Sequence, residues 1–176
     1  MVGRSKRRTM EIWDAYNDKR EKIGQYLVRG ERILSGLYHL CVNVLVRHED
    51  GDVLFMRRSS QKELYPNYCE FGAGGSVLAG EDSLSAVLRE LKEETGLVPS
   101  QIRLIEQIVS SEDQCLFDYY EAIIVGDKER ITYQDGETDE HVWIGIDELS
   151  AFMKDRLLFR HQKTLLKKLI EKQGDR

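Results

Sequence analysis

The chain has 176 residues, of which 41% are hydrophobic and 32% charged, and it contains only 2 prolines. This composition is typical of one compact domain and excludes extensive disorder. The net charge of -5 gives no overall attraction to nucleic acid, and no apolar run approaches the ~20 residues that span a bilayer, so we expect neither a membrane nor a specific nucleic-acid partner.

The three cysteines, Cys41, Cys69 and Cys115, lie far apart and form no CxxC pair. Their odd number favours a reducing compartment and buried thiols over disulfides or zinc. The first residues, MVGRSKRR, are basic, but a polar segment follows them where a secretory signal would have its apolar core. We therefore expect a cytoplasmic protein with a flexible basic tail at residues 1–9 and a single domain over residues 10–176.

The first predicted elements are two strands in MEIWDAYNDKREKIGQYLV, on either side of a polar turn at residues 17–19. This hairpin could extend a sheet or form the edge of a homodimer. A second hairpin is predicted where YHLCVNVLVR and VLFMRR flank a turn signal at residues 49–52. NYCEFGAGG then indicates a short strand that runs into a glycine-rich loop.

Residues 83–95 are predicted to form an amphipathic helix with a signal at each end. Asp82 or Ser83 can cap its N-terminus, and Gly96 can take the left-handed conformation that closes it. The apolar residues expected to pack on a sheet follow the i, i+3, i+4, i+7 pattern and are Leu84, Val87, Leu88 and Leu91.

Three glutamates crowd one side of this helix. Glu90, Glu93 and Glu94 are spaced i, i+3, i+4, and repulsion between such neighbours costs roughly 0.2–0.5 kcal/mol per pair. They would lie at the margin of the apolar stripe, where Arg89 could pair with Glu93 or with Glu81. A solvated acidic face is one explanation. The other is a divalent-cation site, because carboxylates beside carbonyls are the hard ligands that Mg²⁺ and Mn²⁺ prefer.

Three strand-like segments follow the helix: IRLIEQIVS, CLFDYYEAIIV and HVWIGI. An acidic loop at residues 126–140 separates the last two. Residues 147–172 are predicted to form two short helices, the second with a docking stripe of Leu165, Leu166, Leu169 and Ile170. Strands on both sides of a central helix predict an α+β domain with a mixed sheet.

The segment from Gly75 to Leu97 resembles the signature of the Nudix superfamily at every defined position. It reads Gly75, five residues, Glu81, seven residues, and then Arg89-Glu90-Leu91-x-Glu93-Glu94-x-Gly96-Leu97. The resemblance implies the Nudix fold, in which a mixed β-sheet is sandwiched between helices, here with an added N-terminal hairpin. It also implies a hydrolase that cleaves a diphosphate linked to another group, most often a nucleoside.

The same resemblance implies roles for individual residues. The metal ligands, for Mg²⁺ or a substituting Mn²⁺, would be Glu90, Glu93, Glu94 and the carbonyl of Gly74. Glu81 and Arg89 would orient that set through a salt bridge. A glutamate of the box or of a later loop often activates the attacking water in this family, and the candidates here are Glu93, Glu137 and Glu140. The alternative for the loop residues is a solvated turn.

A closer resemblance, over most of residues 10–150, is to the Nudix branch related to isopentenyl-diphosphate isomerase. EIWDAYNDKREKIG, GLYHL, RRSSQK and YPNYCEFGAGG carry it. It implies that Arg58 and Lys62 bind the substrate diphosphate. The isomerase cysteine falls at Ala73, and of its metal histidines only one is matched, by His39. The alternative for His39 is a packed residue of the core or of a strand edge. The intact box therefore ranks a hydrolase above an isomerase-like enzyme and above a non-catalytic nucleotide-binding module.

Two further features concern the substrate. Leu78 stands where many Nudix boxes have a glutamate, so the role of that glutamate is in doubt here. Five aromatic residues could stack a base or belong to the core, namely Tyr65, Tyr68, Phe117, Tyr119 and Tyr120.

Overall fold

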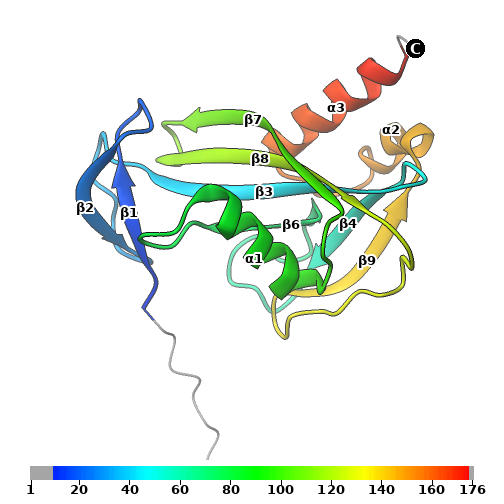
Figure 1. The fold of residues 1–176 in the computed structure, drawn as a ribbon, viewed down its shortest axis with the longest axis horizontal. Coiled ribbons are helices and arrows are strands. Elements are labelled where there is room, and N and C mark those ends of the chain that lie inside the picture. The colour runs from blue at the N-terminus through cyan, green and yellow to red at the C-terminus, as the bar shows by residue number, and fades with distance from the viewer. Residues whose placement is uncertain (1–9, 175–176) are drawn as a thin grey trace, which may run out of the picture.

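The computed structural model describes residues 10–174, so the predicted basic tail at residues 1–9 lies outside the described residues. The first two strands, β1 (Ile12–Tyr16) and β2 (Lys22–Val28), pair antiparallel as predicted. Their hairpin stands at one end of the molecule (Figure 1) and joins the rest through a bridge between Tyr16 and Tyr38. No described helix is long and apolar enough to cross a membrane.

A seven-stranded mixed sheet forms the centre of the fold. Its main order is β5-β4-β3-β8-β7, with β6 paired to β3 and β9 paired to β4. The strands are β3 (His39–His48), β4 (Val53–Arg58), β5 (Cys69–Phe71), β6 (Ala73–Ser76), β7 (Gln101–Ser110), β8 (Cys115–Ile124) and β9 (Thr138–Ile144). The predicted α+β class with a mixed sheet and an N-terminal hairpin is therefore confirmed.

The turn of the second predicted hairpin is present, but its two strands pair with each other only next to that turn. β3 and β4 run antiparallel, but the only residue pair in register is Arg47 with Val53. β3 instead pairs in parallel with β8 from His39 to His48, and in antiparallel with β6. The two strands separate beyond the turn because each has other partners along most of its length.

Two segments predicted as loops contain strands. The glycine-rich loop includes β6, in which Gly74 and Gly75 pair with Asn43 and Val42 of β3. The acidic loop at residues 126–140 ends early, because β9 begins at Thr138 and pairs with β4. Strand pairing with distant residues overrides the local turn signals in both places.

Helix α1 (Ser83–Thr95) has the predicted bounds and ends. The Asp82 carboxylate accepts a hydrogen bond from the Ser85 N–H at 2.8 Å, and Gly96 closes the helix at a φ of 72°. Such an N-cap stabilises a helix by ~1 kcal/mol.

The predicted apolar stripe of α1 is wrong in part. Leu84 and Leu88 are 45% and 37% exposed, whereas Val87 and Leu91 are buried together with Ala86 and Glu94. The small Ala86 side chain faces the sheet, and the helix is rotated so that Glu94 points inward with it. This rotation brings a glutamate of the crowded trio into the interior.

The C-terminal segment packs on the opposite side of the sheet from α1. It contains a 3-10 helix η1 (Ile146–Glu148), α2 (Leu149–Phe152) and α3 (Arg160–Gly174), so the second helix is longer than predicted. The predicted docking stripe is confirmed, since Leu165 and Leu166 are buried and Leu169 and Ile170 are partly buried against the same cluster.

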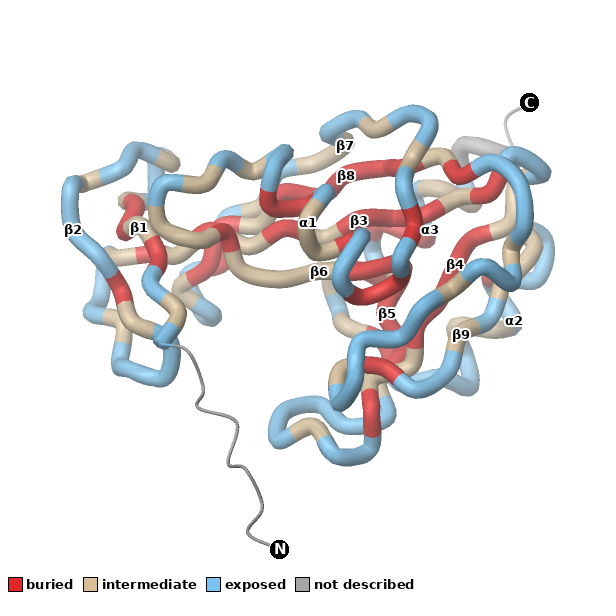
Figure 2. Tube along the Cα trace, turned by 60° about the horizontal axis from the view of Figure 1, so that its bottom comes forward, coloured by how far each residue is buried: buried red, intermediate tan, exposed pale blue. Residues whose placement is uncertain are grey.

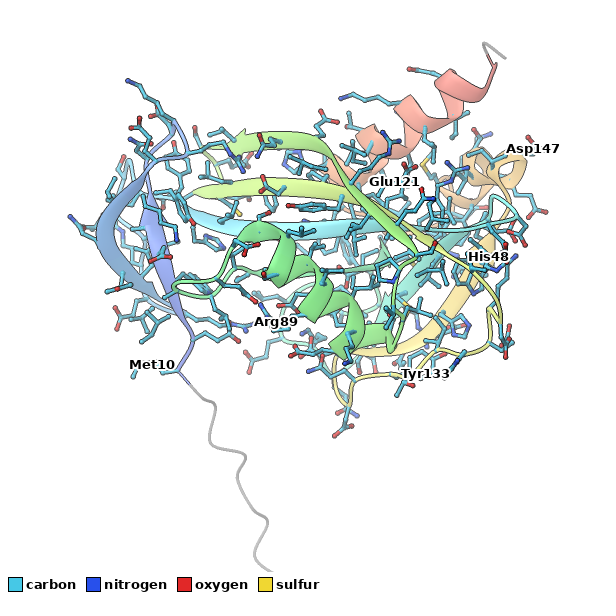
Figure 3. All side chains as sticks on the ribbon, viewed as in Figure 1. Met10, His48, Arg89, Glu121, Tyr133 and Asp147 are labelled. Atoms are coloured by element: carbon cyan, nitrogen blue, oxygen red, sulfur yellow. The ribbon has the colours of Figure 1, made fainter. Side chains whose placement is uncertain are left out.

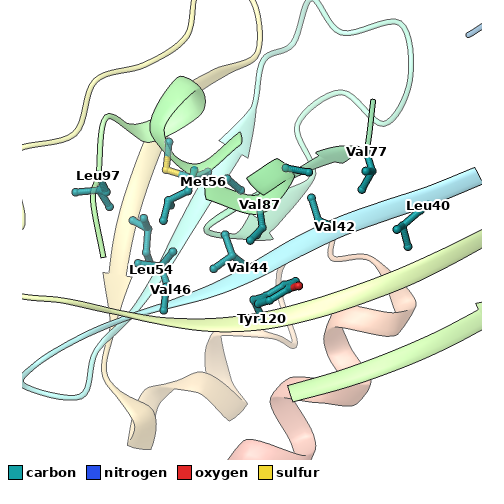
Figure 4. Close-up of a cluster of buried hydrophobic side chains, with 14 of the residues drawn as sticks. Leu40, Val42, Val44, Val46, Leu54, Met56, Val77, Val87, Leu97 and Tyr120 are labelled. Atoms are coloured by element: carbon teal, nitrogen blue, oxygen red, sulfur yellow. The ribbon is translucent and has the colours of Figure 1, made fainter. Parts of the chain in front are cut away.

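The core has one layer on each face of the sheet. Alternate residues of β4 point to opposite layers: Leu54 and Met56 join the cluster under α1, and Val53 and Phe55 join the cluster under α2 and α3. Figure 4 shows the first cluster, and Figure 2 shows buried residues concentrated along β3, β4 and β8. The sheet is therefore sandwiched between helices.

Candidate active site

The first turns of α1 and the loop before it are joined by a bidentate ion pair. Arg89 donates from Nε and Nη2 to the two carboxylate oxygens of Glu81, each at 2.9 Å, and projects from α1 in Figure 3. Its Nη2 also donates to the Ser76 carbonyl at 3.2 Å. This hydrogen bonding lowers the pKa of Glu81 and raises that of Arg89, so both groups are charged.

The Arg89 guanidinium also reaches the glutamates of the helix. Its Nη1 donates to Glu90 Oε1 at 2.6 Å and lies 3.5 Å from Glu93 Oε2. The Glu90 carboxylate packs on Gly75, where an added Cβ would come within 2.3 Å of Glu90 Oε1. The first glycine of the sequence motif thus leaves room for the first glutamate, and the pair Glu81–Arg89 orients it.

Glu94 is the least compensated charge of this region. Its side chain is 7% exposed, and its Oε2 atom has no hydrogen-bond partner among the described residues. Burial raises its pKa well above the ordinary value, and the carboxylates of Glu70, Glu90 and Glu137 raise it further. A hydrogen bond from the Gly74 backbone acts in the opposite direction.

Glu70 is a member of this group that the sequence did not single out. It lies on β5 between Cys69 and Phe71 and is 6% exposed. Burial raises its pKa, while the Arg58 guanidinium, whose Nη1 donates to Glu70 Oε1 at 3.1 Å, opposes that rise. A charged residue in the middle of an apolar strand was the available signal, because charges are rarely buried without a role or a partner.

The two predicted phosphate contacts lie beside Glu70 and are each paired with a carboxylate. Arg58 contacts Glu70 and the carbonyls of residues 64 and 65. Lys62 forms an ion pair with Glu137, the predicted base from the acidic loop. The structure therefore brings these three predicted residues together with Glu70 and Glu94, since Lys62 and Glu137 both influence the pKa of Glu70.

Two predicted residues lie outside this buried group. The Glu93 side chain is 49% exposed, and it meets the edge of the carboxylate group through its contact with Arg89. Glu140 sits on β9 and pairs with Arg57 at 2.8 Å, on a surface shared with Cys69 and not with the glutamates of α1. Of the two loop candidates for water activation, Glu137 lies beside the cluster and Glu140 lies away from it.

Comparison with known proteins identifies the family. The NUDIX domain family matches residues 37–168. The chain belongs to this family. An uncharacterized Nudix hydrolase of Listeria monocytogenes is 42% identical over 89 residues, which are 51% of this chain and 53% of that protein. The chain spans about half the length of the curated relatives it matches.

Solved structures share the Nudix fold. DR0079 from Deinococcus radiodurans gives a TM-score of 0.73 at 21% identity, covering 90% of this chain and 98% of that chain. The NUDIX domain of NrtR from Shewanella oneidensis, solved as a complex with ADP ribose, gives a TM-score of 0.61 at 18% identity, covering 77% and 88%. At these identities the likeness establishes the fold, which confirms the predicted Nudix architecture.

Nudix hydrolases generally use divalent metal ions, and the residues of this box fit one. The donors are carboxylates and a backbone carbonyl, the hard oxygen ligands suited to Mg²⁺ or Mn²⁺. Glu94 Oε2 has no hydrogen-bond partner in residues 10–174, and Glu70, Glu90 and Glu137 repel its charge. A cation among these carboxylates would turn this repulsion into attraction.

The remaining predictions concern aromatic residues and Leu78 around the Nudix box. Tyr119 and Tyr120 are buried, and Tyr120 donates to the Ser83 hydroxyl, so both belong to the core. Tyr65 and Tyr68 contact Phe159 beside Arg58, and Tyr65 is exposed. The Leu78 N–H donates to Glu81, so the residue at that position supports the ion pair through its backbone.

Proposed function

We propose that the chain is a metal-dependent hydrolase that cleaves a diphosphate linkage in a nucleoside diphosphate derivative or a similar small substrate. The observation that carries the proposal is Glu94, a buried carboxylate of the Nudix box with an unpartnered oxygen and three carboxylates near it. Membership of the NUDIX family supports it.

Glu90, Glu94 and the Gly74 carbonyl are the proposed ligands for Mg²⁺, for which Mn²⁺ can substitute, with Glu93 at the exposed rim of the set. Bound there, divalent cations supply charge neutralisation for the diphosphate oxygens and lower the pKa of a water molecule. Glu81 orients Arg89, and Arg89 fixes the Glu90 carboxylate against Gly75.

Arg58 and Lys62 are the proposed diphosphate contacts. Each is paired with a carboxylate, Arg58 with Glu70 and Lys62 with Glu137. A cation between the carboxylates would weaken these pairs and leave both side chains able to donate to phosphate oxygens. Arg58 suits a bidentate contact because its guanidinium presents paired N–H groups.

Two glutamates remain candidates for accepting the proton of the attacking water. Glu137 lies beside the buried carboxylates, and Glu93 is solvent-exposed on α1. Each would take the proton on a carboxylate oxygen. Comparison of Glu137→Gln with Glu93→Gln separates them, since loss of the base lowers kcat by about 100-fold or more whereas loss of a rim charge does not.

The test is a substrate panel of ADP-ribose, other nucleotide sugars, nucleoside di- and triphosphates, and isopentenyl diphosphate, each with Mg²⁺ or Mn²⁺. ADP-ribose comes first because the NUDIX domain of NrtR is solved with that molecule. We expect metal-dependent release of a phosphorylated product by the wild type and loss of it in Glu94→Gln. Glu112→Gln is the matched control, because its pair with Arg160 is highly exposed.

The alternatives give different outcomes in the same panel. Proton exchange into isopentenyl diphosphate without phosphate release would show an isomerase-like enzyme, although Ala73 offers no ionisable group where the isomerase has its cysteine. Tight nucleotide binding without turnover would show a non-catalytic module. Absence of turnover for every compound, with Glu94→Gln behaving like the wild type, would reject the hydrolase proposal.

A further inference from the structure

A second cluster of potential ligands lies away from the glutamates of the Nudix box. It consists of His39 and Cys41 on β3 and Cys115 on β8. The parallel pairing of these strands places His39 opposite Cys115, with Cys41 two residues further along β3. All three cysteines are free thiols, with Cys69 and Cys115 buried and Cys41 half-buried, and the fold brings Cys41 and Cys115 together with a histidine across 74 residues of sequence.

The three side chains meet at metal-ligand spacing. One ligand atom from each residue lies within 4.8 Å of the other two, and Cys41 Sγ is 3.0 Å from His39 Nε2. Two ligands of a tetrahedral Zn²⁺ ion, at ~2.3 Å for sulfur and ~2.0 Å for nitrogen, lie roughly 3.5–3.8 Å from each other. Side-chain movements of about 1 Å or less would therefore produce the geometry of a three-ligand zinc site.

The His39 ring is oriented as a metal-binding histidine usually is. Its Nδ1 lies 3.3 Å from the Gln114 carbonyl, and in the tautomer that donates this hydrogen bond the lone pair of Nε2 faces Cys41. Trp13 of the N-terminal hairpin stacks on the ring at 4.4 Å between centroids and limits its rotation. The Gln114 carbonyl and the Trp13 ring thus orient the histidine without a bound ion.

The two thiols differ in the groups that shift their pKa. Hydrogen bonding from Cys115 lowers the pKa of Cys41, with His39 acting in the same direction, whereas burial raises the pKa of Cys115. Two cysteine sulfurs beside an imidazole nitrogen form a soft donor set, and a bound cation would displace the thiol protons. These donors contrast with the oxygen ligands of the Nudix box, which select hard cations.

We propose that His39, Cys41 and Cys115 form a second metal site, for a thiolate-preferring cation of the Zn²⁺ class, separate from the carboxylate site of the Nudix box. Three protein ligands leave a fourth position for water or another small ligand. A pocket of about 250 Å³ is lined by Tyr38 and Gln114, the residues that precede His39 and Cys115 in the chain.

The location of this Cys₂His site gives it a structural consequence. β3 and β8 supply its ligands, and Trp13 links it to the hairpin of β1 and β2. A cation there would tie the hairpin to the central sheet by fixing the ring on which Trp13 stacks. Zn²⁺ should therefore raise the melting temperature of the reduced protein, since a ligand that binds only the folded state stabilises it.

The test is a titration of the full, reduced chain with Co²⁺, in excess Mg²⁺ to occupy the carboxylate site. We expect one equivalent of Co²⁺ to give thiolate-to-cobalt charge-transfer absorption, and Zn²⁺ to displace it. Cys41→Ser and Cys115→Ser should each lose most of this absorption, and His39→Gln should weaken Co²⁺ binding by at least about tenfold.

Cys69→Ser is the matched control, because Cys69 is also a free buried cysteine but lies on β5, outside the cluster. It should keep the full absorption, as should Glu94→Gln. Absence of thiolate absorption in the folded, reduced wild type overturns the proposal, and this result does not depend on any variant folding. Absorption that survives in Cys41→Ser and Cys115→Ser, or that disappears in Cys69→Ser, overturns it as well.

Discussion

Glu81 and Glu94 belong to the same Nudix box and have opposite environments. Glu81 receives two hydrogen bonds from Arg89, and its pKa is lowered. Glu94 is more deeply buried, has an unpartnered oxygen and has its pKa raised by burial and by three other carboxylates. Glu81 stabilises the folded chain through its pair with Arg89, whereas one carboxylate oxygen of Glu94 has no hydrogen-bond partner among the described residues.

This difference separates the residues that orient other side chains from the residues that bind a ligand. A charge that is paired within the protein orients its neighbours, as Glu81 orients Arg89. A buried charge without a partner costs stability and is kept where a ligand compensates for it. Burial also raises the pKa of Glu70 and Glu90, although each of these carboxylates is paired with an arginine.

The largest expected effect follows from removing the uncompensated charge. Glu94→Gln should lower kcat/KM for the diphosphate substrate by about 100-fold or more, since metal charge stabilisation contributes several kcal/mol. The same substitution should raise the free energy of unfolding of the metal-free protein, because a buried repelled carboxylate is replaced by an amide. Steady-state kinetics and urea unfolding in EDTA measure the two effects. Loss of both activity and stability would contradict the assignment.

Gly75→Ala should displace a ligand without disturbing the fold. The added Cβ would lie 2.3 Å from Glu90 Oε1, so the flexible carboxylate must move. We expect kcat/KM to fall by about 10- to 100-fold, with a change in unfolding free energy below about 1 kcal/mol.

The matched control for this substitution is Gly145→Ala. Its Cβ would meet its nearest atom, Asp52 Oδ1, at an ordinary 3.6 Å, and its φ of -61° suits alanine. This variant should keep wild-type kinetics. Equal activity of the two alanine variants would show that the Glu90 position does not matter for turnover.

Glu81→Gln tests whether Glu81 positions Arg89 and, through it, Glu90. It removes a bidentate, partly buried pair and should lower the free energy of unfolding by about 1–3 kcal/mol. Activity should fall by about tenfold, through a shifted Glu90, and high Mg²⁺ should restore part of it. A variant that is fully stable, or that loses activity which Mg²⁺ does not restore, would argue against a positioning role.

The smallest expected effect is on the pH dependence of the free energy of unfolding, to which Glu94 and Glu81 contribute with opposite signs. Glu94 keeps its proton in the folded state to a higher pH than in the unfolded chain, where its pKa is near 4.5. The metal-free folded state therefore binds more protons, and its free energy of unfolding should fall as pH rises from about 4.5 through the raised folded pKa.

Glu81, with its lowered pKa, contributes stability that is present above its unfolded pKa and lost as pH falls through the folded pKa. Urea unfolding in EDTA across this range should show a decline above about pH 4.5 that is reduced in Glu94→Gln. An unchanged slope in that variant would mean that Glu94 is not the titrating group.

Local signals explain what the sequence predicts well. The bounds of α1 follow from Asp82 and Gly96, which act within one turn of the helix. The pair of Glu81 and Arg89 follows from the motif spacing and is present in the structure. Such features need no knowledge of the rest of the fold.

Features that depend on distant pairing escaped prediction. Glu94 lies on the buried face of α1 together with Ala86, and the β6 strand follows from pairing with β3. Glu70 joins the site because β5 pairs with β4, beside Arg58. Cys41 and Cys115 meet because β3 and β8 run parallel, a pairing that no local pattern indicates.

The most direct test of the central claim is Mn²⁺ binding, followed by the loss of the free-ion signal in electron paramagnetic resonance. Wild type and Glu112→Gln should bind Mn²⁺ with equal affinity, and Glu94→Gln should bind it at least about tenfold more weakly. Equal affinity in all three proteins would contradict the assignment of the buried carboxylates as the metal site.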